Sequence, residues 1–185
     1  MKIGIFGGSF DPVHIGHVAL AVALIEAKKL DLVYIIPANT NPFKKNGRAA
    51  DAKSRLHMCR LAFRDVPKCK VLDIEIKRGG VSYTIDTVHE LFAKQLVSKK
   101  DSLYLLLGED SFESLPKWKQ SDELLQLVTP IVAKRGAHHA NTIQTPLFEV
   151  SATEIRDREH KGLYTGHLLP KSVYNYIQRH NLYHE

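Results

Sequence analysis

The sequence predicts an α/β protein in which a doubly wound parallel sheet is followed by helices at the C-terminal end. Its opening segment, residues 2–6, is almost entirely apolar, as are parallel strands that are buried on both faces. Strand-like and helix-like segments then alternate along most of the chain, which is typical of a parallel sheet covered by helices. A length of 185 residues suits one domain with a substantial core. We therefore expect a single domain over residues 1–185, with residues 151–185 as its C-terminal helical part.

The individual elements follow from hydrophobic spacing and from the residues that begin or end them. Arg78-Gly79-Gly80 breaks the third strand. Ser82 or Thr84 is a candidate cap for the helix that comes next, and Ser121 caps a later one. Pro170 fits the first turn of the last helix. The expected strands lie at residues 2–6, 32–36, 71–76, 103–107, 128–133 and 147–150. The expected helices lie at residues 17–29, 51–63, 84–97, 121–127, 152–160 and 171–180, and residues 136–145 are expected to form a polar loop.

Composition places the chain among soluble globular proteins, with 44 % hydrophobic and 25 % charged residues. No apolar run approaches the roughly 20 residues that a membrane helix needs. The N-terminal segment has no cleavable apolar core, so we expect no signal peptide. Cys59 and Cys69 lack metal-type spacing, and we expect two reduced thiols in a cytoplasmic protein.

The net charge of +6 and the pI of about 9.3 are compatible with an anionic partner. Either a nucleic acid or a small polyanion would satisfy that charge, and a basic but inert surface is a third interpretation. Charge alone does not distinguish among the three.

Doubly wound sheets bind ligands outside the carboxyl ends of their strands, so the residues that directly follow each strand are the candidates for a site. The first such stretch has Gly7 and Gly8, which let the backbone approach a ligand and can adopt positive φ. Free amides at the start of the following helix attract anions. His14 and His17 stand three residues apart there, so both can project from one side of the first turn. This pattern predicts a phosphate site, with helix capping by the two histidines as the alternative.

A second stretch, Ser151-Ala152-Thr153-Glu154-Ile155-Arg156, begins a helix near the C-terminal end. Ser151 and Glu154 form the S-x-x-E capping box. One turn further, the planar guanidinium of Arg156 suits a phosphate group. Both interpretations can hold together. Arg135, at the end of the fifth predicted strand, is another candidate for a phosphate.

The His-x-Gly-His motif at residues 14–17 resembles the nucleotidylyltransferase superfamily, and Gly-Gly-Ser-Phe-Asp-Pro-Val-His-x-Gly-His is similar to bacterial nicotinate-nucleotide adenylyltransferases. The resemblance implies a Rossmann-like fold in which Ser9, Phe10, His14 and His17 hold the phosphates of ATP. Residues 151–156 resemble the superfamily signature Ser-Ser/Thr-x-x-Arg, which assigns Ser151, Thr153 and Arg156 to the same phosphates. Ala152 departs from the second hydroxyl of that signature.

Other stretches resemble the same family more specifically. Lys44 ends a proline-containing loop as the lysine of the family does, although Phe43 replaces a common histidine. The Gly-x-Asp at residues 108–110 and Trp118 have family counterparts, the tryptophan stacking on a pyridine ring. The resemblance assigns to the nicotinate nucleotide pocket Ser82, Tyr83, Thr84, Asp86, Thr87, Gly108, Asp110 and Trp118.

The implied reaction transfers the adenylyl group of ATP to nicotinate mononucleotide and releases pyrophosphate. The attacking phosphate is mostly deprotonated already, since its second pKa is about 6. Catalysis therefore requires positioning and charge stabilisation, for which His14, His17, Lys44 and Arg156 are the candidates. We expect Mg²⁺ to arrive with ATP and no metal site made by the protein.

Two alternative functions stay open. Phosphopantetheine adenylyltransferase shares both end signatures, although residues 82–87 and Trp118 argue against it. A basic RNA-binding module with a degenerate nucleotide site is the other, and no interleaving of aromatic and basic residues supports it. The expected partners are thus small-molecule substrates and neither nucleic acid nor membrane, while a homo-oligomer remains open.

Overall fold

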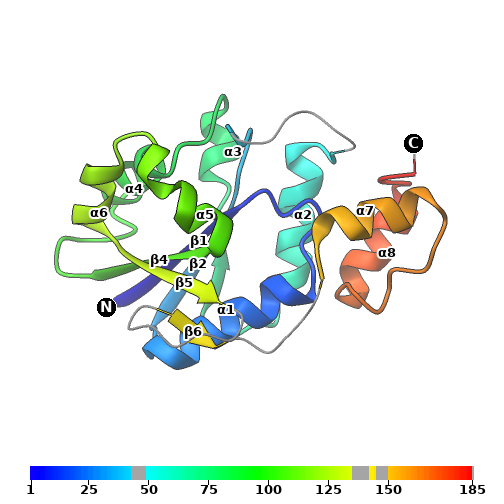
Figure 1. Cartoon of the computed structure of the whole chain (residues 1–185), viewed down its shortest axis with the longest axis horizontal. Helices are drawn as coiled ribbons and strands as arrows, with labels where there is room; N and C mark the ends of the chain where they lie inside the picture. The colour runs from blue at the N-terminus through cyan, green and yellow to red at the C-terminus, as the bar shows by residue number, and fades with distance from the viewer. Residues whose placement is uncertain (43–48, 135–141, 145–149, 185) are drawn as a thin grey trace.

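A parallel sheet forms the centre of the computed structural model, which describes residues 1–42, 49–134, 142–144 and 150–184 (Figure 1). Within these residues the sheet has six strands in the order β3-β2-β1-β4-β5-β6, and all neighbouring strands are parallel. This confirms the predicted doubly wound α/β class, because the strand order reverses on either side of β1. The strands are β1 (Lys2–Gly8), β2 (Leu32–Pro37), β3 (Cys69–Val71), β4 (Ser102–Gly108), β5 (Thr129–Lys134) and β6 (Thr142–Gln144).

Helices cover the two faces of this sheet in two groups, each with its own apolar core. Alternation along β2 shows how the strands supply both cores: Val33 and Ile35 belong to one cluster, and Tyr34 and Ile36 to the other. Each fully buried aliphatic side chain contributes about 1.5–3 kcal/mol. The first cluster includes residues of α1 (Ile15–Lys28), α2 (Ala52–Phe63), α7 (Ala152–His160) and α8 (Lys171–Arg179). The second includes residues of α3 (Ile74–Arg78), α4 (Thr84–Ala93) and α6 (Ser121–Leu127).

The C-terminal helices α7 and α8 lie at one end of the molecule, away from α4 and α6 (Figure 1). Ile155 of α7 and Val173 and Ile177 of α8 are fully buried in the first cluster, so these helices share a core with α1 and α2. Among the described helices, none is long and apolar enough to cross a membrane.

The third predicted strand, residues 71–76, is wrong in its extent. Only Cys69–Val71 pairs with β2, and the chain then turns into α3. The apolar alternation of this stretch arises because Ile74 packs in the core while the buried Glu75 accepts a hydrogen bond from Thr87.

Three other boundaries differ from the prediction. The helix expected at residues 84–97 ends at Ala93, because Gln95 adopts a left-handed φ of 55° and the Leu96 amide bonds back to Leu91. The loop expected at residues 136–145 contains β6, which extends the sheet beside β5. A short helix α5 (Glu109–Ser114) follows β4 directly and continues into the 3₁₀ turn η1 (Leu115–Lys117).

The strand expected at residues 147–150 falls largely outside the described residues, and Val150 itself lies in no strand. Neither Ser82 nor Thr84 caps α4, and Ser121 does not cap α6. Cys59 and Cys69 are both free thiols, as expected, and burial raises the pKa of each.

Candidate active site

In the turn between β1 and α1, the residue with a left-handed backbone conformation is an aromatic residue and not a glycine. Phe10 has a left-handed φ of 48°, whereas neither Gly7 nor Gly8 has a positive φ, so the expected use of glycine conformational freedom is wrong here. Gly8 is required for space instead: a Cβ atom on it would lie 3.1 Å from the Phe10 ring. Phe10 is buried and contacts Phe6 and His17 edge-on, at centroid distances of 5.2 and 5.0 Å. The backbone of the turn is therefore fixed by packing beneath it.

The two histidines of the turn stack on each other, with ring centroids 3.7 Å apart. His17 accepts a hydrogen bond at Nδ1 from the His14 backbone N–H, 3.2 Å away, so His17 does help to cap α1. His14 is only 7 % exposed, and burial lowers its pKa from 6.5 to about 4. Its Nδ1 has no hydrogen-bond partner within the described part of the chain. His14 is thus neutral without ligand, and a neighbouring phosphate would favour its charged form.

Gly16 explains why the motif between the histidines contains glycine. A Cβ atom on Gly16 would lie 3.0 Å from Val150 Cγ1 and 3.1 Å from His14 Nδ1. The first turn of α1 is therefore pressed against the segment that leads into α7. The Ile15 amide donates to the Leu168 carbonyl at 3.1 Å, so one of the amides at this helix start is used within the protein.

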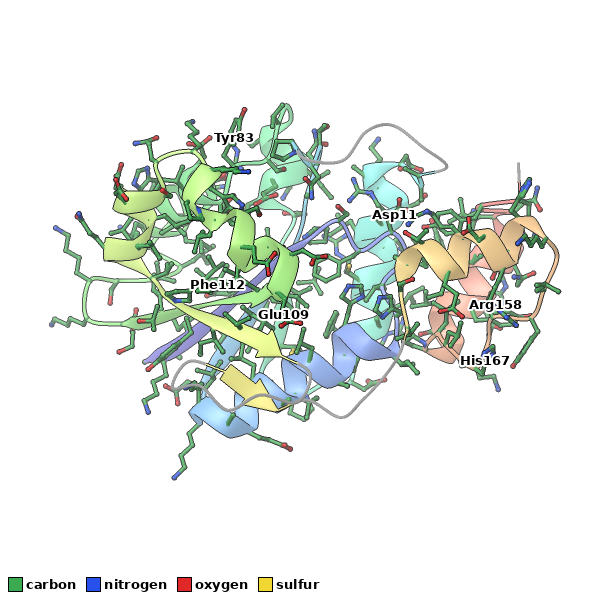
Figure 2. All side chains as sticks on the ribbon, viewed as in Figure 1. Asp11, Tyr83, Glu109, Phe112, Arg158 and His167 are labelled. Atoms are coloured by element: carbon green, nitrogen blue, oxygen red, sulfur yellow. The ribbon has the colours of Figure 1, made fainter. Side chains whose placement is uncertain are left out.

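Helix α7 brings Arg156 to the same place. Ser151 caps this helix by accepting from the Glu154 amide at 3.1 Å, which confirms the cap acceptor expected from the sequence. Arg156 Nη1 donates to the Asp11 carbonyl at 2.6 Å, and Nη2 donates to Thr153 Oγ1 at 3.2 Å. Residues 145 positions apart in the chain are thus joined directly, with Asp11 lying in the region between α2 and α7 (Figure 2). The two stretches predicted to bind phosphate are therefore in direct contact.

Arg55, on α2, contacts the segments that carry predicted site residues, although it was not among the residues predicted from the sequence. It is 6 % exposed and donates to four backbone carbonyls, those of Ser9, Ala38, Asn39 and Ala50, at 2.7, 2.7, 2.8 and 3.2 Å. These carbonyls belong to the segments after β1 and β2 and to the approach to α2. A signal was present, since an arginine stands among apolar residues at helical spacing.

The segment that carries the predicted nicotinate pocket is fastened to the end of β2. The Asn39 amide donates to Ser82 Oγ at 2.9 Å, and the Ser82 amide donates to the Thr40 carbonyl at 2.9 Å. Thr40 and Val81 form an isolated parallel bridge. Because β2 lies beside β1, residues 82–84 and the turn between β1 and α1, which we call the phosphate turn after its predicted role, lie at the same carboxyl end of the strands. No side chain caps the N-terminus of α4, which begins at Thr84.

Thr87, which the sequence assigned to the nicotinate pocket, is a buried residue. It is 1 % exposed, and its hydroxyl donates to Glu75 Oε1 at 2.5 Å while accepting from Arg78 Nη2 at 2.9 Å. Burial raises the pKa of Glu75. Arg78 continues the network to Glu90 at 2.6 Å. The hydroxyl of Thr87 thus holds α3 and α4 together.

Asp86 and Trp118 each contact a polar side chain of the segment around η1. Lys119 pairs with Asp86 at 2.8 Å and lies 4.9 Å from the centroid of the Tyr83 ring. Trp118 is half-buried, and its Nε1 donates to Ser114 Oγ at 3.2 Å. Its indole packs against the second core cluster. Lys119, which contacts the Tyr83 ring, is the sequence neighbour of Trp118, so the two aromatic residues are connected through this segment.

The end of β4 contributes exposed groups. Gly108 and Asp110 are both exposed, at the last position of β4 and in the first turn of α5. Glu109 and Phe112 of α5 lie below Tyr83 in the view of Figure 2. Lys44 and Arg135, with Phe43, lie outside the described residues, so their predicted roles stay predictions.

Comparison with known proteins agrees with this geometry. The family model described as cytidylyltransferase-like matches residues 5–158. The nicotinate-nucleotide adenylyltransferase of Bacillus subtilis (strain 168) is 38 % identical over 188 residues, which cover 98 % of this chain and 98 % of that protein.

Solved structures with the same fold include the Plasmodium falciparum nicotinic acid mononucleotide adenylyltransferase complexed with NaAD. It matches with a TM-score of 0.77 and 19 % identity over 98 % of this chain and 97 % of that one. The same protein complexed with APC matches with a TM-score of 0.72 and 18 % identity, over 98 % of this chain and 96 % of that one. At such identities the similarity shows a common fold.

Proposed function

The chain belongs to the cytidylyltransferase-like family, and we infer that it is an enzyme of nicotinate-nucleotide adenylyl transfer. It transfers the adenylyl group of ATP to nicotinate mononucleotide, with nicotinate adenine dinucleotide and pyrophosphate as products. The observation that carries this function is the meeting of two helix N-termini, those of α1 and α7, at the carboxyl end of β1. The contact between Arg156 and the Asp11 carbonyl joins them.

The two helix starts suit the phosphates of ATP. Each carries the positive end of a helix dipole and backbone N–H groups that attract anions. We propose that His14 and His17 bind phosphate oxygens from the α1 side, and that Arg156, with Ser151 and Thr153, binds them from the α7 side. The backbone of Gly7, Gly8, Ser9 and Phe10 shapes the floor between them.

Charge stabilisation is then the main chemical task. The acceptor phosphate needs no general base, because its second pKa is about 6. As negative charge builds on the leaving pyrophosphate, the guanidinium of Arg156 and a protonated His14 are placed to stabilise it. The proposal includes Lys44 in this role and Arg135 as a further phosphate contact, from the sequence resemblance.

The segment after β2 supports a second site for the pyridine nucleotide. The uncapped N-terminus of α4 offers backbone donors that suit a carboxylate, which favours the acid form of the pyridine over the amide. Trp118 and Tyr83 offer flat aromatic surfaces, and Gly108 and Asp110 lie at the end of β4 for the ribose. Ser82, Thr84 and Asp86 complete the rim, while Thr87 supports it from below.

We propose that Mg²⁺ enters with ATP. Among the described residues no three His, Cys, Asp or Glu side chains gather into a metal cluster. Phosphate oxygens and water are therefore the ligands in this proposal, which is how Mg²⁺ is usually held. A cytoplasmic location is likewise proposed, on the free thiols of Cys59 and Cys69.

Turnover with three alternative acceptors tests the function. The purified protein is mixed with ATP, Mg²⁺ and either nicotinate mononucleotide, nicotinamide mononucleotide or 4′-phosphopantetheine, and pyrophosphate release is measured. We expect the acid mononucleotide to give the highest kcat/KM. Preferential turnover of 4′-phosphopantetheine, or no turnover of either pyridine nucleotide, would overturn the proposal.

A further inference from the structure

Tyr183, which follows α8, reaches back to the phosphate turn. Its hydroxyl donates to Asp11 Oδ1 at 2.7 Å, across 172 positions of sequence. The side chain is 7 % exposed, and burial together with Asp11 raises its pKa. The hydroxyl therefore stays protonated at physiological pH and remains a donor.

The backbone around this contact is bent in a way that side chains resist. Tyr183 has a φ of 69°, and Phe10, next to Asp11, has a φ of 48°. Left-handed φ angles are unfavourable for bulky residues and persist only where surrounding structure imposes them. Both bends lie next to or within the Tyr183–Asp11 contact.

The segment that carries Tyr183 is itself anchored. The Leu182 amide donates to the Ile177 carbonyl at 3.1 Å. Beside it, His184 lies 3.4 Å from the buried Glu159 of α7, which also accepts from Gln178 at 2.9 Å. Tyr183 is thus fixed to both C-terminal helices.

Asp11 connects Tyr183 to three parts of the proposed active site. Its carboxylate also accepts from the Ala50 amide at 3.0 Å, and its carbonyl accepts from Arg156 Nη1. It stands three residues before His14. A shift of Asp11 would consequently move the α1 turn, the approach to α2 and the guanidinium of Arg156 together.

We propose that Tyr183 is a positioning residue for adenylyl transfer: by donating to Asp11 it holds the phosphate turn in register with Arg156. The inference rests on the proposed function, because it assigns Arg156 and the turn to the phosphates of ATP. Tyr183 touches no substrate in this proposal. It affects the rate through the alignment of the reacting groups, because displacing these groups by about 1 Å can lower the rate about a hundredfold.

Tyr183→Phe tests the proposal because it removes the hydroxyl and keeps the ring. Tyr176→Phe is the matched control, since the Tyr176 hydroxyl of α8 contacts Ser54 Oγ, at 3.4 Å, rather than a residue of the turn between β1 and α1. With both substrates saturating, at a temperature well below each unfolding midpoint, we expect Tyr183→Phe to lower kcat about tenfold or more. The KM for the pyridine nucleotide should change about twofold or less, and Tyr176→Phe should leave kcat near the wild-type value.

A lower unfolding midpoint with wild-type kcat would show that Tyr183 is only structural, and would overturn the proposal. If Tyr183→Phe loses cooperative unfolding, Asp11→Ala replaces it, because alanine removes the acceptor oxygen that an asparagine would keep: the same kcat loss is expected, and wild-type kcat overturns the proposal. ATP binding measured by calorimetry without a second substrate separates this result from failure of the proposed function. We expect Tyr183→Phe to weaken ATP binding even if the wild type turns over none of the acceptors.

Discussion

His14 shows how burial changes the chemistry of a single residue. Its pKa falls from 6.5 to about 4 because the charged imidazole loses its hydration. His14 is therefore neutral in the absence of ligand. A bound phosphate would raise its pKa, because a nearby negative charge favours the charged imidazole.

The first prediction concerns the pH dependence of stability. The folded pKa of His14 lies below the unfolded value, so the unfolded chain binds more protons between pH 6.5 and about 4. The contribution of His14 to the free energy of unfolding is therefore complete above pH 6.5 and is lost as the pH falls toward about 4. Between pH 7.5 and 5 we expect the wild type to lose about 2 kcal/mol more unfolding free energy than His14→Gln.

Urea unfolding at the two pH values measures this difference. Carboxylates elsewhere affect both proteins equally, so only the difference between the proteins is interpreted. An identical pH dependence of wild type and His14→Gln would contradict the low pKa of His14.

At the scale of elements, the site depends on how separate segments are fastened to one another. Arg55 draws the ends of β1 and β2 toward α2, and Ser82 binds the start of α4 to the residues after β2. Gly16 lets the first turn of α1 approach the start of α7. Backbone groups that would otherwise lack partners in a buried region are satisfied in the process.

The second prediction concerns Arg55→Lys. Lysine keeps the charge but cannot place donors on four carbonyls in different directions. Two or more buried carbonyls would lose their partners, and we expect the unfolding free energy to fall by about 3 kcal/mol. Urea denaturation at pH 7.5 measures the change.

Arg60→Lys is the matched control on the same helix. Arg60 pairs with Asp73 at 3.0 Å and its side chain is 53 % exposed, so its replacement should cost about 0.5 kcal/mol or less. Equal effects of the two substitutions would show that Arg55 does not fasten these segments.

For the whole molecule, the binding of ATP should connect parts of the chain that are distant in sequence. The phosphate turn comes from the N-terminal end and α7 from the C-terminal end, on a shared core. At a concentration about 100 times its Kd, ATP should raise the unfolding free energy by about 2.7 kcal/mol.

Hydrogen exchange of backbone amides tests this third prediction, because it shows which segments ATP protects. Amides of residues 9–17 and of residues 151–156 should both exchange more slowly when ATP is bound, because both helix starts contact it. Residues 121–127 of α6, on the opposite face, are an internal reference. Protection confined to one of the two segments would contradict a shared phosphate site.

Much of the fold could be predicted because its signals are local. The apolar run of β1 and the helical spacing of α2 and α4 report burial within a few residues, and the elements were found at or near the expected positions. Errors arose where tertiary contact overrode local pattern. Residues 74–76 alternate like a strand, yet form a helix because Glu75 meets Thr87 of α4.

By itself the sequence determined the fold class and the family resemblance, and it predicted two phosphate-binding stretches, because these depend on residue types at fixed short spacings. Only the tertiary structure decided that Arg156 meets Asp11, that Arg55 and Tyr183 bond to the turn after β1, and that Thr87 is buried against Glu75. Each of these facts is a contact between residues far apart in the chain. Such contacts depend on how the elements pack in three dimensions, and no local spacing of residues records them.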